Sequence, residues 1–249
     1  MTGPTWDDHR LAFSSWAERY DRFRPRYPEA AVRYLVGTDP SARVLDVGAG
    51  TGRLAVAVAT LGRDVLAVEP DDVMRSFAEA ALPGRTARGS AEELPVPDAS
   101  YDVVVAGQAF HWFEPDRALP EITRVLRPGG ALGIIWNARD DSVAWVAELS
   151  ELVGGEDRSS RFGSGPPDLA PWFGAAVERT FRHTQEVDVD LVVGLASSYS
   201  YVALRQDRDA VLAEVRAIAT RERDRVGRDR FDLPYVTRAF RAEPASGRS

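Results

Sequence analysis

Short apolar runs alternate with amphipathic stretches through the first part of the chain. The apolar runs are rich in Val, Leu and Ile and predict strands at 42–47, 64–69, 101–107 and 129–137. The stretches between them place apolar side chains at helical spacing, at 51–62, 71–82 and 114–126. This alternation is typical of βαβ units, so it predicts a doubly wound, mostly parallel sheet with helices on both faces.

The flanking segments add helices at both ends. Helices are expected at 11–22, at 28–36 with Pro28 at its first position, at 142–153 and over most of 188–222; strands are expected at 176–187 and 234–242. Pro120 is expected to kink or break the helix that contains it. Residues 154–174 are rich in Gly, Pro and Ser and predict a loop or mobile segment.

We expect one domain over 1–249. It comprises an N-terminal helical lid at 1–40, a cofactor-binding core at 41–140, and substrate-side helices and last strands at 141–249. Hydrophobic residues make up 44% and charged residues 28% of the chain, as in ordinary globular proteins. With a net charge of −7, no long apolar run and no secretory signal, we expect a cytoplasmic protein that binds neither nucleic acid nor membrane.

Missing residue types exclude several chemistries. The sequence has no Cys, which excludes thiolate metal sites and cysteine nucleophiles. It also has no Lys, because all 31 basic residues are Arg, and this excludes a lysine Schiff base and a P-loop lysine. The three His residues, His9, His111 and His183, show no metal-ligand spacing, so no metal is expected.

A glycine-rich turn follows the first predicted strand. That strand ends near Asp46 and runs into Gly48, Gly50 and Gly52, and a helix is expected to start near Thr51. Glu69 ends the next strand, where a carboxylate accepts hydrogen bonds from both hydroxyls of a ribose. Together these features indicate a nucleoside-bearing cofactor at the carboxyl ends of the strands.

The spacing of the turn distinguishes between cofactors. A dinucleotide site has the pattern G-x-G-x-x-G, whereas here Arg53 occupies the sixth position. Asp46 beside the turn would repel a pyrophosphate but suits the ammonium end of an amino-acid tail. These residues favour S-adenosyl-L-methionine over NAD.

The motifs VLDVGAGTG, VEP, GSAEELPVPDASYDVVVAGQAFHWF and RVLRPGGALGIIW resemble those of class I S-adenosylmethionine-dependent methyltransferases. The similarity extends to the group that includes trans-aconitate methyltransferase-like proteins, and the N-terminal WAERYDRFRPRYP looks like the opening of that group. The resemblance implies a Rossmann-like sheet of seven strands, with an N-terminal helical lid and a C-terminal helical cap. It also implies transfer of a methyl group to a small-molecule acceptor.

The resemblance further implies roles for the matching positions. Cofactor contacts are expected from Tyr20, Arg24, Asp46, Gly48, Ala49, Gly50, Glu69, Pro70, Met74, Ala91, Glu92 and Gln108. Within this set, Glu69 takes the ribose, Ala91 and Glu92 contact the adenine edge, and Arg24 pairs with the cofactor carboxylate. Ser90 departs from the acid found in related sequences, which shifts the expected adenine contact toward Glu92 and the backbone.

The acceptor side is expected near the fourth predicted strand. Histidine is the side chain that ordinarily changes charge near neutral pH, so His111 is the candidate catalytic base, or else a hydrogen-bond donor to the substrate or a structural histidine. Trp112, Trp136, Tyr199 and Tyr201 are candidates to line the substrate pocket, against the alternative of plain packing. The segment GQAFHW replaces the Asn/Asp-Pro-Pro-Tyr turn that amino-group methylation of adenine or glutamine commonly uses.

Two other functions stay open at this point. One is a nucleotide-dependent oxidoreductase, and the other is a non-catalytic protein that retains the fold. We expect a monomer or a homodimer.

Overall fold

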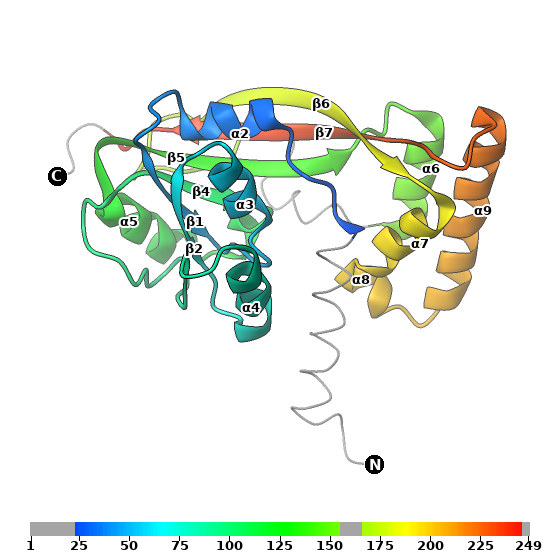
Figure 1. Ribbon diagram of the computed structural model, residues 1–249, viewed down its shortest axis with the longest axis horizontal. Helices are drawn as coiled ribbons and strands as arrows, with labels where there is room; N and C mark the ends of the chain where they lie inside the picture. The colour runs from blue at the N-terminus through cyan, green and yellow to red at the C-terminus, as the bar shows by residue number, and fades with distance from the viewer. Residues whose placement is uncertain (1–22, 155–165, 246–249) are drawn as a thin grey trace, which may run out of the picture. The chain divides into compact units, whose positions relative to one another are not determined.

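The computed structural model describes residues 23–154 and 166–245. The helix expected at 11–22 and the candidate residue Tyr20 lie outside the described residues. Figure 1 shows the described elements in chain order by colour. These are α2 (Glu29–Val36), β1 (Arg43–Val47), α3 (Arg53–Thr60), β2 (Asp64–Val68), α4 (Asp72–Ala81), β3 (Thr86–Ala87), β4 (Tyr101–Gly107), the 3₁₀ turn η1 (Phe110–Trp112), α5 (Pro115–Val125), β5 (Leu126–Arg139), α6 (Ala144–Val153), β6 (Val177–Val187), α7 (Val189–Ser197), α8 (Ser200–Ala203), α9 (Arg208–Val226) and β7 (Phe231–Ala242).

Seven strands form one sheet in the order β3-β2-β1-β4-β5-β7-β6. β1 pairs in parallel with β2 and with β4, and the β2–β3 and β4–β5 pairs are also parallel. The strand β7 runs against β5 (Figure 1). The α/β, Rossmann-like, mostly parallel seven-stranded sheet predicted from the sequence is therefore confirmed. The strand order reverses between β1 and β4, which is where such sheets bind ligands.

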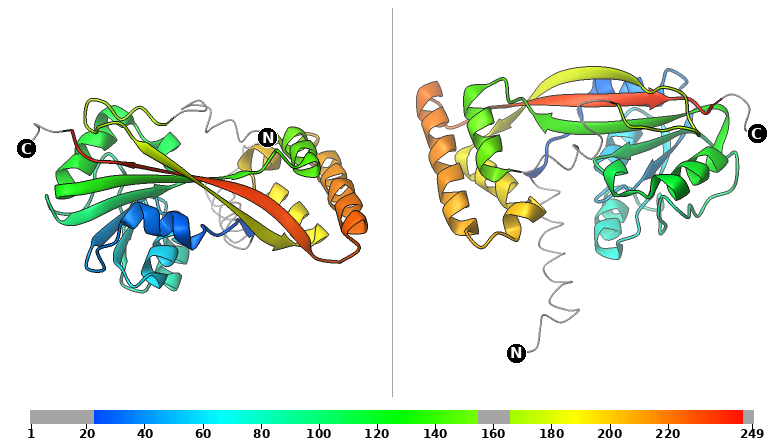
Figure 2. Two further views of the ribbon diagram at one scale, coloured as in Figure 1. Left: turned by 90° about the horizontal axis from the view of Figure 1, so that it is seen from above. Right: turned by 180° about the vertical axis from the view of Figure 1, so that it is seen from behind.

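Successive residues of the central strands face two different cores, as the period of two in a strand requires. Val44, Val103 and Val105 pack with α2 and α3 on one face of the sheet. Their neighbours Leu45 and Val104 pack with α5 on the other face. Figure 2 shows α2 and α3 opposite α5 across these strands. Because both faces are buried, these strands read as continuous apolar runs in the sequence.

The chain divides into two compact units. Among the described residues, one unit contains 27–137, 166–181 and 237–245, and the other contains 23–26, 138–154 and 182–236. The second unit has its own apolar core, in which α9 packs with α6 and α7 (Figure 2). The strands β5, β6 and β7 contribute residues to both units. The expectation of a single domain stays a prediction.

Side-chain caps mark the starts of two helices. Asp71 caps α4 by accepting a hydrogen bond from the backbone N–H of Met74, and Asp188 caps α7 in the same way from Leu191. Of the two effects expected of Pro120, the break is wrong, because α5 continues through it, and the kink stays a prediction. The hydrogen bond that Pro120 removes is the one to the carbonyl of Asp116 in the first turn, so most of the helical ladder remains.

No helix within the described ranges combines the length and the apolar character that crossing a bilayer requires.

Candidate functional site

The turn after β1 is built from left-handed glycines. Gly48, Gly50 and Gly52 have φ angles of 66°, 57° and 84°, a region that side chains rarely adopt. The turn ends at Gly52, which is the N-cap of α3, so the helix starts two residues later than the Thr51 expected from the sequence. Three left-handed residues in five are what allow β1 to turn sharply into α3.

Space around the turn is also tight. A Cβ atom on Gly48 would lie 2.8 Å from the Cβ of Ala109, in the segment that follows β4. A Cβ on Gly52 would lie 3.0 Å from the Cβ of Ala78 in α4. Gly52 is therefore needed for helix packing, whereas Gly48 brings the turn after β1 against the segment after β4, at the point where the strand order reverses.

The backbone donors of the turn already have acceptors within the protein. The N–H groups of Gly48 and Ala49 both donate to the carbonyl of Val68, at 2.9 and 3.1 Å. The N–H of Gly50 donates to Oε2 of Glu69 at 2.8 Å. These three amides hold the turn to the end of β2 and are not available to cradle a phosphate.

Glu69 lies directly after β2 and is 8% exposed. Its Oε2 accepts from Gly50, and its Oε1 accepts from the N–H of Asp71 at 3.0 Å. Burial raises the pKa of this carboxyl, although both backbone hydrogen bonds oppose the shift. Each oxygen has a further lone pair, so each can still accept a hydrogen bond from a hydroxyl group.

Asp46 is fully buried at the end of β1. Neither carboxyl oxygen makes a hydrogen bond of ordinary geometry. The backbone N–H of Ala55, in the first turn of α3, points toward the carboxyl and lowers its pKa. Burial raises the pKa of Asp46 to about 8, and the nearby Glu69 carboxyl adds to the rise. A buried carboxyl in this condition is strongly stabilised by a neighbouring cation.

The predicted adenine-side residues lie on the segments after β2 and β3. Pro70 is exposed, and Met74 is half-buried in α4, with its Cε 3.3 Å from where a Cβ of Gly50 would lie. Ala91 is buried, whereas Glu92 is half-buried and accepts a hydrogen bond from the N–H of Glu114 at 2.9 Å.

Gln108 has a strained backbone directly after β4. Its φ of 55° is left-handed, which is uncommon for a residue with a side chain and clusters at functional sites. Its backbone N–H donates to the carbonyl of Ile135, and its Nε2 donates to the carbonyl of Asn137 at 2.8 Å. Asn137 Oδ1 in turn accepts from the buried hydroxyl of Thr237 at 2.5 Å.

His111 and Trp112 form the 3₁₀ turn η1 with Phe110. His111 is half-buried and its ring centroid lies 5.0 Å from that of Trp112. Trp112 is 62% exposed, which is unusual for so large an apolar side chain. Trp136 instead packs edge-on against Phe240 within the apolar core, with ring centroids 5.6 Å apart.

The remaining candidates lie in the other compact unit. The guanidinium of Arg24 stands 4.1 Å above the ring of the buried Tyr199, and Arg139 donates to the Tyr199 hydroxyl at 2.6 Å. Tyr201 lies in α8, where the structure does not describe its side chain. The contact between Arg24 and a cofactor carboxylate stays a prediction.

The sequence did not indicate Asn137, Thr237 or Arg139 as residues of interest. Asn137 and Thr237 come together from β5 and β7, and no spacing in the sequence brings them into register. Arg139 carries no local signal, because an Arg at the end of a strand is ordinarily a surface residue, whereas here it is 4% exposed. Within 23–154 and 166–245, no group of three or more acidic or His side chains is arranged to hold a metal.

Known proteins share both this sequence pattern and this fold. A family profile described as a methyltransferase domain matches residues 45–134. An uncharacterized methyltransferase of Mycobacterium tuberculosis (strain H37Rv) is 40% identical over 240 residues, which cover 94% of this chain and 96% of the relative. An uncharacterized methyltransferase-like protein of Schizosaccharomyces pombe is 30% identical over 241 residues, which cover 90% and 92% of the two chains.

A solved structure from Anaeromyxobacter dehalogenans, provisionally assigned as a type II methyltransferase, superposes with a TM-score of 0.63. It is 26% identical in sequence, and the match covers 89% of this chain and 98% of that one. These relatives confirm the resemblance seen in the sequence: the chain belongs to the class I S-adenosylmethionine-dependent methyltransferase family.

Proposed function

We propose that this protein transfers a methyl group from S-adenosyl-L-methionine to a small-molecule acceptor. The observation that carries the proposal is a pair of buried carboxyls at the glycine turn. Glu69 accepts from the turn itself, and Asp46 is fully buried with its pKa raised to about 8. The carboxyl of Glu69 suits a ribose, and that of Asp46 suits an ammonium group. A ribose and an ammonium group occur together on a nucleoside that carries an amino-acid tail.

The same geometry disfavours the oxidoreductase alternative. A pyrophosphate needs backbone donors aimed at it from a glycine turn and a helix N-terminus. Here the amides of Gly48, Ala49 and Gly50 donate to protein acceptors, and Asp46 lies beside the start of α3. A buried carboxyl with a pKa of about 8 offers a pyrophosphate no attraction, and its charged form would repel the ligand.

The residues present fit the cofactor in three places. Glu69 would hold the ribose hydroxyls, Asp46 would stabilise the ammonium, and the cradle at Gly48, where a side chain would clash, would let the backbone approach the methionine part. Met74 and the segment at Ala91 and Glu92 would flank the adenine. When bound, the cofactor supplies a methyl group on a positively charged sulfur, which is already activated toward a nucleophile.

The protein's task is then mainly one of orientation. Holding an acceptor in line with the methyl group accounts for roughly 7–11 kcal/mol of the barrier in well-oriented reactions. The strained Gln108, whose Nε2 donates to the carbonyl of Asn137, would orient groups at the switch point of the sheet. His111 in η1 would accept the proton of a phenol or a carbon acid, whereas a carboxylate acceptor loses no proton and needs no base.

A small acceptor suits the charge and the composition. The net charge of −7 disfavours a nucleic acid, and the exposed aromatic ring of Trp112 offers a flat apolar surface beside His111. We expect such an acceptor to be a cytoplasmic metabolite.

The direct test is a panel of small carboxylates, phenols and amines incubated with the protein and S-adenosyl-L-methionine. The readout is formation of S-adenosylhomocysteine that depends on the acceptor. Turnover of at least one class is expected, and the variant Asp46→Asn should reduce it. Cofactor binding without turnover of any acceptor class would favour the non-catalytic alternative.

A further inference from the structure

The segment from Ser90 to Ser100, here called the β3–β4 segment, has almost no regular structure of its own. Its one β-type contact is an isolated bridge between Ser90 and Glu93. It nevertheless carries Ala91 and Glu92, which the proposed function places at the adenine edge. A segment without a hydrogen-bonded ladder needs other groups to fix its backbone.

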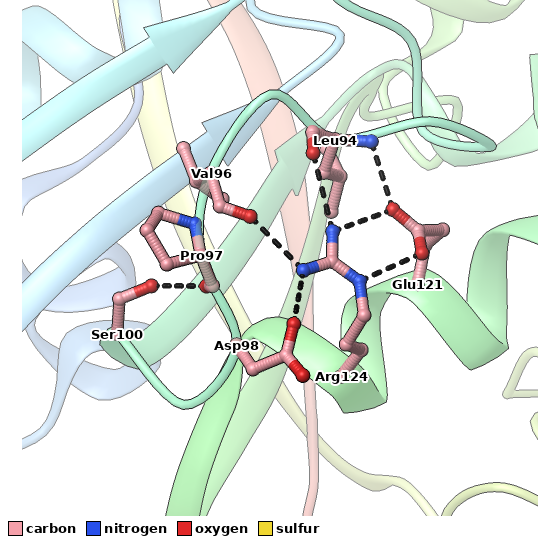
Figure 3. A network of polar contacts seen from close by, with 7 residues as sticks. All are labelled: Leu94, Val96, Pro97, Asp98, Ser100, Glu121 and Arg124. Atoms are coloured by element: carbon pink, nitrogen blue, oxygen red, sulfur yellow. Dashed lines mark hydrogen bonds and ion pairs between the residues drawn. The ribbon is translucent and has the colours of Figure 1, made fainter.

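The guanidinium of Arg124 in α5 supplies three of those hydrogen bonds. Its Nη1 donates to the carbonyl of Val96 at 3.0 Å and to Oδ1 of Asp98 at 2.7 Å. Its Nη2 donates to the carbonyl of Leu94 at 3.1 Å (Figure 3). One guanidinium therefore binds the segment at three points, through two backbone carbonyls and one side chain.

The rest of the guanidinium is held by Glu121, one turn earlier in the same helix. The Nε and Nη2 of Arg124 donate to the two carboxylate oxygens at 2.8 and 2.7 Å, so all five donors of Arg124 are used. Glu121 Oε2 also accepts from the N–H of Leu94 at 2.9 Å, so it binds the segment directly (Figure 3). The hydrogen bonds from Arg124 hold the pKa of Glu121 below its usual value, which keeps the carboxylate charged.

Further contacts join the segment to α5. Glu92 accepts from the N–H of Glu114, the N-cap residue of α5, at 2.9 Å. The backbone N–H of Ala99 donates to the carbonyl of Arg124 at 2.9 Å. The segment is thus anchored to one helix on both sides of its apolar residue Leu94, which is buried.

We propose that Arg124 and Glu121 are positioning residues that fix the β3–β4 segment in the shape that recognises the adenine base. This rests on the proposed function. Neither residue needs to touch the cofactor. The planar guanidinium of Arg124 fixes the positions of the carbonyls of Leu94 and Val96, and these fix the backbone that leads to Ala91 and Glu92. Removing the Arg124 side chain takes away three of the hydrogen bonds that hold the segment and should selectively weaken recognition of the base.

The test compares S-adenosylhomocysteine with S-inosylhomocysteine, in which hypoxanthine replaces adenine and the sugar and amino-acid tail are unchanged. Wild-type protein should bind the adenine compound about tenfold more tightly or better, as expected when polar groups read the edge of a base. In Arg124→Gln this preference should fall below about threefold, while Arg124→Lys, which keeps the charge but not the planar five-donor fork, should lie between the two.

A matched control is present in α9. Arg225 donates through Nε and Nη2 to both oxygens of Glu222, at 2.7 Å each, with the same spacing of three residues. Arg225→Gln therefore removes an equivalent ion pair without releasing the β3–β4 segment, and it should leave the preference between the two bases unchanged.

The outcomes separate the two proposals. No binding of S-adenosylhomocysteine by the wild-type protein contradicts the proposed function. Binding with no preference for adenine in the wild type, or an undiminished preference in Arg124→Gln, overturns the positioning role alone. If Arg124→Gln does not fold, the same ratio measured in Arg124→Lys and Glu121→Gln decides in the same way.

Discussion

The side chain of Glu69 accepts a hydrogen bond from the backbone N–H of Gly50 at 2.8 Å. This contact joins the end of β2 to the turn after β1, which are 19 residues apart in the sequence. The acid proposed to hold the ribose is therefore also a structural part of the glycine turn. Changes at Glu69 should affect the shape of the turn and ligand affinity together.

We expect Glu69→Ala to weaken binding of S-adenosylhomocysteine by at least about tenfold, because two ribose acceptors and one support of the turn are lost together. Isothermal titration calorimetry measures the change. Glu79→Ala is the control, since Glu79 also accepts from a glycine amide, that of Gly84, and from the hydroxyl of Thr86. Equal affinity in Glu69→Ala and the wild type would remove Glu69 from the site.

Substitution of Gly48 should cost more stability than substitution of an unconstrained glycine. Gly48→Ala combines a φ of 66° with a Cβ 2.8 Å from Ala109, whereas Gly84→Ala has a φ of 73° and nothing within 4 Å. The left-handed conformation alone costs about 1–2 kcal/mol, so the excess loss in Gly48→Ala reports the clash. Urea denaturation of both variants measures this difference, and equal losses would mean that the segment after β4 moves away freely.

Asp46 should make both stability and ligand binding depend on pH. Its folded pKa of about 8 lies above the ordinary value of 3.8, so between these values the folded state binds a proton that the unfolded state does not. The free energy of unfolding should therefore decline as pH rises from about 4 to about 8, and Asp46→Asn should flatten this decline. Denaturation of both proteins across that range is the measurement.

Ligand binding reverses the proton balance at Asp46. An ammonium group beside this carboxyl lowers its pKa, so binding of S-adenosylhomocysteine should release a proton. The affinity should therefore rise with pH, by up to about tenfold per pH unit, until about pH 8. Calorimetry in two buffers of different ionisation enthalpy detects the release, which Asp46→Asn should abolish. Binding without proton exchange in the wild type would place the ammonium away from Asp46.

Thr237 should be essential for the arrangement that holds Gln108. Thr237→Val leaves Oδ1 of the 9% exposed Asn137 without its 2.5 Å hydrogen bond, which typically costs about 1–3 kcal/mol. Thr123→Val is the control, because the Thr123 hydroxyl donates only to a carbonyl of its own helix. Thermal denaturation compares the two, and similar small shifts would show that Asn137 finds another donor.

The strands and helices of the first half were predictable because their signals are local. The conformations of the apolar runs at β1, β2 and β4, and of the glycines after β1, follow from neighbouring residues in the sequence. The tolerance of α5 for Pro120 was not predictable from the spacing alone, since the effect depends on how near the start of the helix it lies.

The candidate site was predictable only where the position of a residue in the local sequence indicates its role. Glu69 and Asp46 occur at strand ends beside a glycine turn, so their position was evident, but the raised pKa of Asp46 depends on complete burial by distant segments. The hydrogen bonds of Gln108, Asn137 and Thr237 join the segment after β4 to β5 and β7, and those of Arg124 join a helix to an irregular segment. Such partners become neighbours only once the sheet order is known.

The most direct test of the central claim is a titration of the purified protein with S-adenosylhomocysteine and, separately, with NAD. We predict one binding site for S-adenosylhomocysteine with a Kd on the order of micromolar and no binding of NAD at millimolar concentration. Binding of NAD, or no binding of S-adenosylhomocysteine, would contradict the assignment of Asp46 and Glu69 to a cofactor with an amino-acid tail.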